Sequence, residues 1–273
     1  MEKFLTDVHT HSDFSFDGEE KLEVMVETAL KKGIAFYGIA EHVDFDVLIT
    51  KGADFQRQID AEEYFHCARH LQEDYAGCMN VLVGAEFGYS EEEKAHTMYL
   101  SMQKKYRPDF VVNSVHCENG EDYYYGQPFD GKDKKTAIRR YLQLIRKSLD
   151  APYDYDIVGH IGYAVRYAPY TDKKITLAEF GEELDDIFKT VIKRDKILEV
   201  NSSNKGGDGL FFPNRELLKR YYELGGRKIS FASDAHSKER ILSCREEVVK
   251  ELVEIGFTEL TVPCCGEHIK IPL

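Results

Sequence analysis

The chain has 273 residues, of which 42% are hydrophobic, and its formal net charge is −13 at pH 7. This length and apolar content allow one domain with a sizeable core, so we expect a single domain over residues 1–273. The acidic balance argues against nonspecific binding to nucleic acid phosphates or anionic membranes, because both require basic patches. We therefore expect neither nucleic acid nor a membrane among its partners.

The six cysteines are sparse for this length and show no C-x-x-C spacing, so we expect reduced thiols. The first residues lack the apolar core of a signal peptide, and no later stretch approaches 18 consecutive apolar residues. These features predict a cytoplasmic protein and specify no oligomeric state.

Short apolar runs alternate with longer amphipathic segments along almost the whole chain. The runs carry Val, Ile, Phe or Leu and end in polar residues, and they predict strands at 4–9, 35–40, 80–87, 109–115, 155–160, 197–201 and 228–233. Apolar residues three and four apart predict helices at 22–32, 61–75, 96–105, 134–149, 177–193, 214–224 and 241–255.

This alternation is typical of repeated βα units around a parallel sheet. Seven units predict an α/β fold with a closed but distorted (β/α)7 TIM-like barrel, and the lack of a glycine-rich phosphate loop disfavours an open doubly wound sheet. The run at 259–262 predicts one short extra strand. The long connections at 43–60 and 117–133 are expected to be functional loops.

Candidate metal ligands follow nearly every predicted strand. The first strand delivers His9 and His11, and imidazoles one residue apart on an extended chain point to the same side. The later strands end in Glu41-His42, Glu86, His116, His160 and Asp234-x-His236. Because the carboxyl ends of barrel strands open on one face, we expect these side chains to converge.

Histidine and carboxylate ligands without thiolates suit Zn, Fe or Mn, and a carboxylate such as Glu86 can bridge two ions. Such ions lower the pKa of a coordinated water and neutralise an oxyanion, so the cluster indicates hydrolysis. Phosphate monoesters need up to ~10²¹-fold acceleration, which a multimetal site suits.

Other histidines and aromatic residues have simpler interpretations. His66 and His70 lie four apart on a predicted helix without an H-E-x-x-H context, so we place them on its exposed face. His96 and His268 are expected to be structural. The run Tyr123-Tyr124-Tyr125 either packs within a surface loop or forms a lid over a ring-bearing substrate.

Four segments resemble the motifs of the polymerase and histidinol phosphatase (PHP) family, and the resemblance spans nearly the whole chain. They are His9-x-His11, Glu41-His42, Glu86 with the separate His116, and Asp234-x-His236. Three further segments resemble the histidinol-phosphate phosphatase branch of this family. They are Gly-Ala-Glu-Phe at 84–87, Asn-Ser-Val-His at 113–116 followed by Phe129-Asp130, and Gly-His-Ile at 159–161.

This resemblance implies a trinuclear site on a distorted (β/α)7 barrel, with two to three divalent transition metals bound. It implies one metal on His9, His11, Glu86 and Asp234, a second on Glu86, His116 and His160, and a third on Asp17, His42 and His236. The chain departs from some family members at Asp17, where those have a histidine eight residues after the first motif histidine. An oxygen ligand there changes the metal preference of the third position.

The resemblance and the chemistry both point to Arg166 as the phosphate ligand, because a planar guanidinium can bind two phosphate oxygens. Lys205 and Arg215 are two candidates for a second basic group in the substrate site. An acid such as Asp17 or His236 is expected to protonate the leaving alkoxide.

The sequence thus predicts a metal-dependent phosphomonoesterase that hydrolyses L-histidinol phosphate to L-histidinol and phosphate in histidine biosynthesis. Two alternatives stay open. One is another PHP-family phosphoesterase acting on phosphotyrosine or on nucleic acid 3′ ends, and the other is a noncatalytic barrel that serves as a binding module.

Overall fold

The structure is a computed structural model that describes residues 4–203 and 209–273. Seven strands form one parallel sheet in the order β1-β2-β3-β4-β7-β8-β9. Their bounds are β1 Leu5–Asp7, β2 Ile34–Val43, β3 Asn80–Gly88, β4 Phe110–Ser114, β7 Ile157–Val158, β8 Ile197–Asn201 and β9 Ile229–Ala232.

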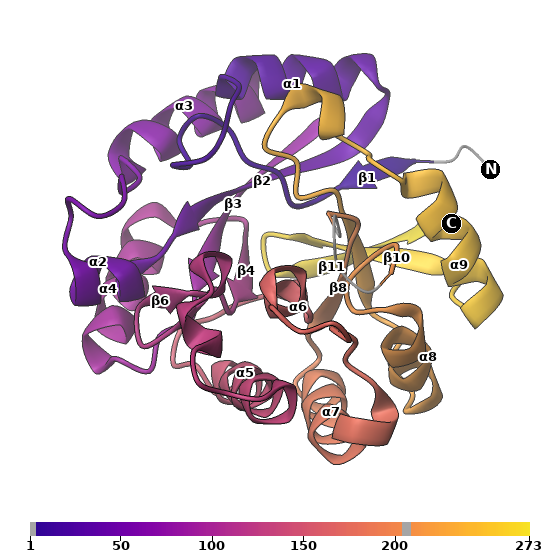
Figure 1. Ribbon diagram of the computed structural model, residues 1–273. Helices are drawn as coiled ribbons and strands as arrows, with labels where there is room; N and C mark the ends of the chain where they lie inside the picture. Colours follow the sequence, from indigo (N-terminus) through magenta and orange to yellow (C-terminus); the bar gives the residue numbers. More distant parts are fainter. Residues whose placement is uncertain (1–3, 204–208) are drawn as a thin grey trace.

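The two edge strands of this sheet, β1 and β9, meet and nearly close it into a barrel (Figure 1). Three backbone hydrogen bonds join them near their carboxyl ends: Val8 N to Phe231 O at 3.3 Å, Asp234 N to His9 O at 2.9 Å, and His11 N to Ala235 O at 2.9 Å. The predicted distorted (β/α)7 barrel is confirmed.

Helices surround the strands, as Figure 1 shows. Helix α7 illustrates why, because a stripe of apolar side chains three and four residues apart faces the sheet and is fully buried: Phe180, Leu184, Ile187, Phe188 and Val191. The outer helices are α1 Leu22–Lys31, α3 Ala61–Asp74, α4 Glu93–Tyr106, α5 Lys134–Ser148, α7 Leu177–Lys193, α8 Arg215–Glu223 and α9 Arg245–Ile255.

An antiparallel hairpin of β10 Glu259–Cys264 and β11 Glu267–Pro272 closes the amino-terminal end of the barrel. Its Val262 and Ile271 pack with the apolar side chains that fill the barrel interior. Cys265 N donates to Asp109 O at 3.1 Å, next to the start of β4. The opposite end, where the strands finish, is therefore left for the functional side chains.

The two long connections contain short elements that the sequence patterns did not predict. Helix α2 Phe45–Lys51 lies in the first. The second holds a small hairpin of β5 Cys117–Glu118 and β6 Glu121–Asp122, followed by the 3-10 turns η1 Tyr123–Tyr125 and η2 Gln127–Phe129. After β7 comes the short helix α6 Tyr163–Tyr167, and the 3-10 turn η3 Lys238–Arg240 precedes α9.

Some predicted bounds were wrong. The last helix begins at Arg245 and not at 241, because Leu242 and Cys244 have φ of 62° and 56°, which an α-helix cannot contain. The fifth strand keeps only Ile157–Val158 of the predicted 155–160. The predicted lone strand at 259–262 is one arm of the hairpin described above.

All six cysteines fall within the described residues and are free thiols, as predicted. Among the helices of the described residues, none is both long and apolar enough to cross a membrane.

Candidate metal centre

The carboxyl ends of the strands bring all nine predicted metal ligands into one cluster. They come from the loops after β1 and β9 and from the ends of β2, β3, β4 and β7. Six of the nine are buried, namely His9, His11, Glu86, His116, His160 and Asp234. The side chains of His42, His236 and Asp17 are 12%, 24% and 42% exposed, so the cluster opens to solvent at this last group.

Glu86 lies at the middle of the cluster and is fully buried. Its Oε1 accepts a hydrogen bond from Ser114 Oγ at 2.6 Å and lies 2.8 Å from His160 Nε2 and 3.2 Å from His116 Nε2. One carboxylate oxygen thus faces the two histidines that were predicted to share a metal with it.

The other oxygen, Glu86 Oε2, faces histidines of the first and the third predicted metal groups. It lies 2.7 Å from His42 Nδ1, 3.5 Å from His9 Nε2 and 3.7 Å from His11 Nε2. Glu86 Oε2 and His42 Nδ1 are nevertheless both buried atoms without a hydrogen-bond partner. Orphaned donor atoms aimed at a common point are what a bound cation would satisfy.

Within the first and the third predicted metal groups, the candidate ligand atoms also lie close to one another. His11 Nε2 lies 3.1 Å from His9 Nε2 and 3.3 Å from Asp234 Oδ1. On the exposed side, Asp17 has one carboxylate oxygen 3.3 Å from His236 Nε2 and the other 3.7 Å from His42 Nε2. The ligand atoms of His9, His11 and Asp234, of His11, His42 and His236, and of His42, Glu86 and His116 lie within 4.8 Å of one another in each trio.

Carboxylates outside this cluster orient its imidazoles. His9 Nδ1 lies 2.6 Å from Glu199 Oε1, and the second oxygen of Glu199 accepts the backbone N–H of His160 at 2.7 Å. His11 Nδ1 lies 3.1 Å from Ser15 Oγ, which itself donates to Glu41 Oε2 at 2.5 Å. Partners of this kind fix the ring orientation and raise the basicity of a metal-binding histidine.

Asp44 holds His116 in the same way, with Asp44 Oδ1 3.0 Å from His116 Nδ1. The backbone of β3 leaves room for this contact only because residue 88 is glycine, since a Cβ there would collide with Asp44. Sequence reasoning missed Asp44 and Glu199. A carboxylate inside the apolar strand β8 was the available signal for Glu199.

The close packing of histidines and carboxylates in the cluster shifts their pKa values. Burial raises the pKa of Glu86 and Asp234, but the neighbouring histidines outweigh it and hold both carboxyl pKa values well below their usual range. Burial, aided by the nearby His42 and His236, lowers the pKa of His11 well below its usual value. Ionised carboxylates and a neutral imidazole are the forms that bind metals.

A cavity of about 260 Å³ lies against the exposed side of the cluster, with Asp17, His42 and His236 in its lining. Arg166, on α6, also lines this cavity with a half-buried side chain. Its Nη2 donates to the backbone oxygen and to Oγ of Ser203, the latter at 3.2 Å, while its Nε is buried without a partner. The predicted phosphate ligand therefore shares a cavity with the predicted metal ligands.

Residues 7–203 match the family model described as the PHP domain. The chain belongs to the PHP domain family. The match runs from the last residue of β1 past the end of β8, so the residues of all but the last of the resembling motifs fall within it.

Two curated PHP relatives each share 30% identity with this chain. One is a "Probable histidinol-phosphatase" of Clostridium acetobutylicum, over 86% of this chain and 88% of its own length. The other is a "Histidinol-phosphatase" of Lactococcus lactis subsp. lactis, over 93% and 92%. A crystal structure of histidinol phosphate phosphatase from L. lactis, complexed with Zn, L-histidinol and phosphate, has a TM-score of 0.82 and 27% identity, and covers 97% of this chain and 99% of that one.

Of the two candidates for a second basic group, only Arg215 falls within the described residues. Arg215 lies at the start of α8 and pairs with Glu251 and with Glu254 of α9, the latter at 3.1 Å, outside the cavity lining. The prediction that it contacts substrate is therefore not supported by its position. Lys205 lies outside the described residues.

The three residues of the run Tyr123-Tyr124-Tyr125 have different surroundings. Tyr123 is buried against Phe129 and Tyr141, so it packs within the loop. Tyr124 and Tyr125 are exposed and line the cavity. His66 and His70 lie on the exposed face of α3, as predicted.

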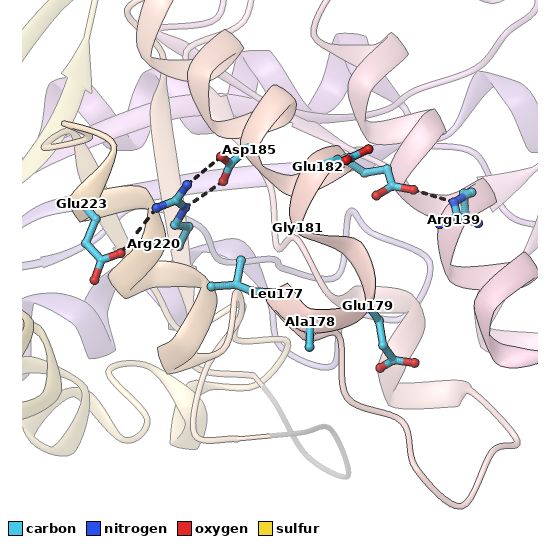
Figure 2. Close-up of a pocket in the computed structure, with 10 residues that line it drawn as sticks. Arg139, Leu177, Ala178, Glu179, Gly181, Glu182, Asp185, Arg220 and Glu223 are labelled. Carbon is cyan, nitrogen blue, oxygen red and sulfur yellow. Dashed lines mark hydrogen bonds and ion pairs between the residues drawn. The ribbon is translucent and has the colours of Figure 1, made fainter.

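A larger hollow, about 580 Å³, lies on the outer surface between α5, α7 and α8 (Figure 2). Its charged side chains pair with one another, as in Arg220 with Asp185 at 2.7 and 2.8 Å and Arg139 with Glu183. It contains none of the predicted ligands, so size alone does not identify the reaction site of this PHP domain.

Proposed function

We propose that this PHP protein is a metal-dependent phosphomonoesterase that hydrolyses L-histidinol phosphate to L-histidinol and phosphate, a reaction of histidine biosynthesis. The observation that carries the proposal is the cluster of nine histidine and carboxylate ligands beside a cavity that also contains Arg166. Two relatives named histidinol-phosphatase, aligned over most of the chain, support the choice of substrate. So does the L. lactis structure with Zn, L-histidinol and phosphate.

The ligand set fits two or three divalent transition metals, with Zn, Fe and Mn as candidates. We assign His9, His11, Glu86 and Asp234 to one ion, Glu86, His116 and His160 to a second, and Asp17, His42 and His236 to a third. When bound, such ions lower the pKa of a coordinated water and neutralise phosphate oxygens. Glu86 contributes to two of the three positions because its two oxygens face different histidines.

The chain's own side chains supply positioning and proton transfer. Arg166 can direct paired N–H donors at two phosphate oxygens, which places the ester at the cluster edge and stabilises charge that develops on those oxygens. Asp17 and His236 lie 3.3 Å apart at the solvent-facing side of the cavity, and they are our candidates for the group that protonates the leaving alkoxide.

The small size of the cavity favours a free phosphorylated metabolite over the phosphotyrosine and nucleic acid alternatives. The dense set of converging ligands likewise favours catalysis over a noncatalytic binding module, because without cations three carboxylates would repel one another.

Phosphate release from purified protein tests this proposal. L-histidinol phosphate should exceed simple sugar phosphates, a phosphotyrosine peptide and a 3′-phosphorylated oligonucleotide in kcat/KM. A preference for the peptide or the oligonucleotide would show that the proposed substrate is wrong, but it would leave the proposed metal-dependent hydrolysis standing. Undiminished activity after verified metal removal would refute the proposal as a whole.

A further inference from the structure

The cavity beside the metal cluster contains a carboxylate that the proposed chemistry does not use. Asp122, at the end of β6, lines the cavity. Its Oδ1 accepts hydrogen bonds from Tyr124 N at 2.8 Å and from the hydroxyl of Tyr163 at 3.1 Å. Both donors are uncharged, and within residues 4–203 and 209–273 no lysine or arginine pairs with Asp122.

A carboxylate in this position is costly without a cation. Burial raises the pKa of Asp122, which means that its surroundings disfavour the ionised form. The other cavity carboxylate outside the cluster, Asp44, is already committed to His116. Asp122 is therefore the carboxylate available to a positively charged ligand.

Aromatic side chains surround Asp122 and would add to the attraction of a cation. Tyr124, Tyr125, Tyr163 and Tyr167 line the same cavity, and the Tyr124 ring lies 5.0 Å from that of Tyr167. Ring faces attract ammonium groups, and the attraction grows as water is excluded. The cavity wall on this side is thus suited to a small organic cation.

Tyr163 sets the separation between this wall and the metal cluster. Its ring centroid lies 5.2 Å from that of His116 and 5.3 Å from that of His160, while its hydroxyl bonds Asp122. The Arg166 guanidinium lies 5.7 Å from the same ring centroid. One ring therefore separates an anion-binding region of metals and Arg166 from a cation-binding region at Asp122.

L-histidinol phosphate carries these two charges a few bonds apart, with a primary ammonium on the carbon next to the phosphoester methylene. We propose that Asp122, with the aromatic wall formed by Tyr124, Tyr125, Tyr163 and Tyr167, binds the substrate ammonium group and selects amino phosphates over phosphomonoesters without a positive charge. This inference rests on the proposed function and adds to it the residue that determines specificity.

The test uses metal-loaded Asp122→Asn protein. Asparagine has the same shape and keeps an oxygen that can accept from Tyr124 N, so the loop should stay in place. A charged hydrogen bond is worth about 1.5–3 kcal/mol, which corresponds to roughly a 10- to 150-fold loss of kcat/KM on L-histidinol phosphate. We expect the loss mainly in KM, because the contact is made equally in the ground and transition states.

Two substrates without the ammonium group separate recognition from general damage. The desamino analogue, 3-(imidazol-4-yl)propyl phosphate, and p-nitrophenyl phosphate should lose less than about threefold in Asp122→Asn. Asp130→Asn is the matched control, because Asp130 is exposed in the same loop and does not line the cavity. It should leave all three substrates unchanged.

The outcomes distinguish this inference from the function on which it rests. If wild-type protein prefers L-histidinol phosphate but Asp122→Asn loses equally on all three substrates, or on none, the assignment of Asp122 is wrong and the function stands. If wild-type protein hydrolyses p-nitrophenyl phosphate and shows no preference for L-histidinol phosphate, the proposed function fails and this assignment fails with it.

Discussion

Replacing Glu86 with glutamine is the most direct test of the metal centre. The substitution keeps the size of the side chain and removes one negative charge from a fully buried position. It also presents an NH₂ group either to the ring nitrogens of His9 and His42, which lie 3.5 and 2.7 Å from Oε2, or to that of His160, which lies 2.8 Å from Oε1. A donor in that place opposes a cation where the carboxylate attracts one.

The size of the effect follows from Coulomb's law. Two unit charges about 4 Å apart at an effective dielectric constant of about 20 interact by about 4 kcal/mol. At about 1.4 kcal/mol per tenfold change, the loss amounts to roughly 10³ in the affinity for one cation. Since both Glu86 oxygens face ligand groups, we expect a comparable loss at a second position and a fall in kcat/KM of at least 10³.

The assay is competition between apoprotein and a chromophoric chelator for Zn²⁺, followed by elemental analysis and phosphate release. His66→Ala and His70→Ala are controls, because both histidines are exposed on α3 and should change neither metal content nor rate. Similar losses at Glu86 and at both controls, in protein that melts as wild type does, would show that the ligand assignment is wrong.

Three further results are expected. Arg166→Ala should lower kcat/KM by roughly 10² or more, about 2.7 kcal/mol, with unchanged metal content and partial recovery in Arg166→Lys; wild-type kinetics would return Arg166 to a structural role. Glu199→Gln should weaken Zn²⁺ binding about 10- to 100-fold in chelator competition, because Glu199 orients His9 and the backbone of His160; unchanged affinity would contradict that role. Dialysis against a chelator should abolish phosphate release and lower the melting temperature, and added Zn²⁺ should restore both; a rate that survives metal removal would eliminate the mechanism.

The barrel could be predicted because each βα unit has a recognisable local pattern of apolar residues. The β8 strand was predicted at its observed bounds, since Ile197–Asn201 is a short apolar run between a helix and a polar loop. The short helix α6 was missed because five residues are too few for apolar positions three and four apart to repeat. The strand β11 was missed although Ile269-Lys270-Ile271 alternates and pairs with β10 across a tight turn.

Some residues of the candidate site could likewise be predicted from the sequence, and others could not. Barrel geometry sends every strand end to one face, which is why ligands as far apart as His9 and His236 could be grouped from the sequence. Glu199 was missed, although it is a carboxylate inside an apolar strand, because its role depends on a 2.6 Å contact with His9, 190 residues away. Asp122 was missed because its hydrogen bond with the Tyr163 hydroxyl joins residues 41 apart in the sequence. The ion pair of Arg215 with Glu254 of α9 likewise joins residues that are distant in the sequence.

The junction between β1 and β9 has a consequence for how the molecule matures. His9 and His11 follow the first strand, whereas Asp234 and His236 follow the last, and the Asp7 carboxylate accepts the backbone N–H of Ser233 across 226 residues of chain. A cation bound by these groups would link the two ends of the barrel, and links that close long loops remove the most chain entropy. A nascent chain that has not yet added β9 holds only part of the ligand set. The full set of candidate metal ligands is therefore assembled only when the barrel is complete.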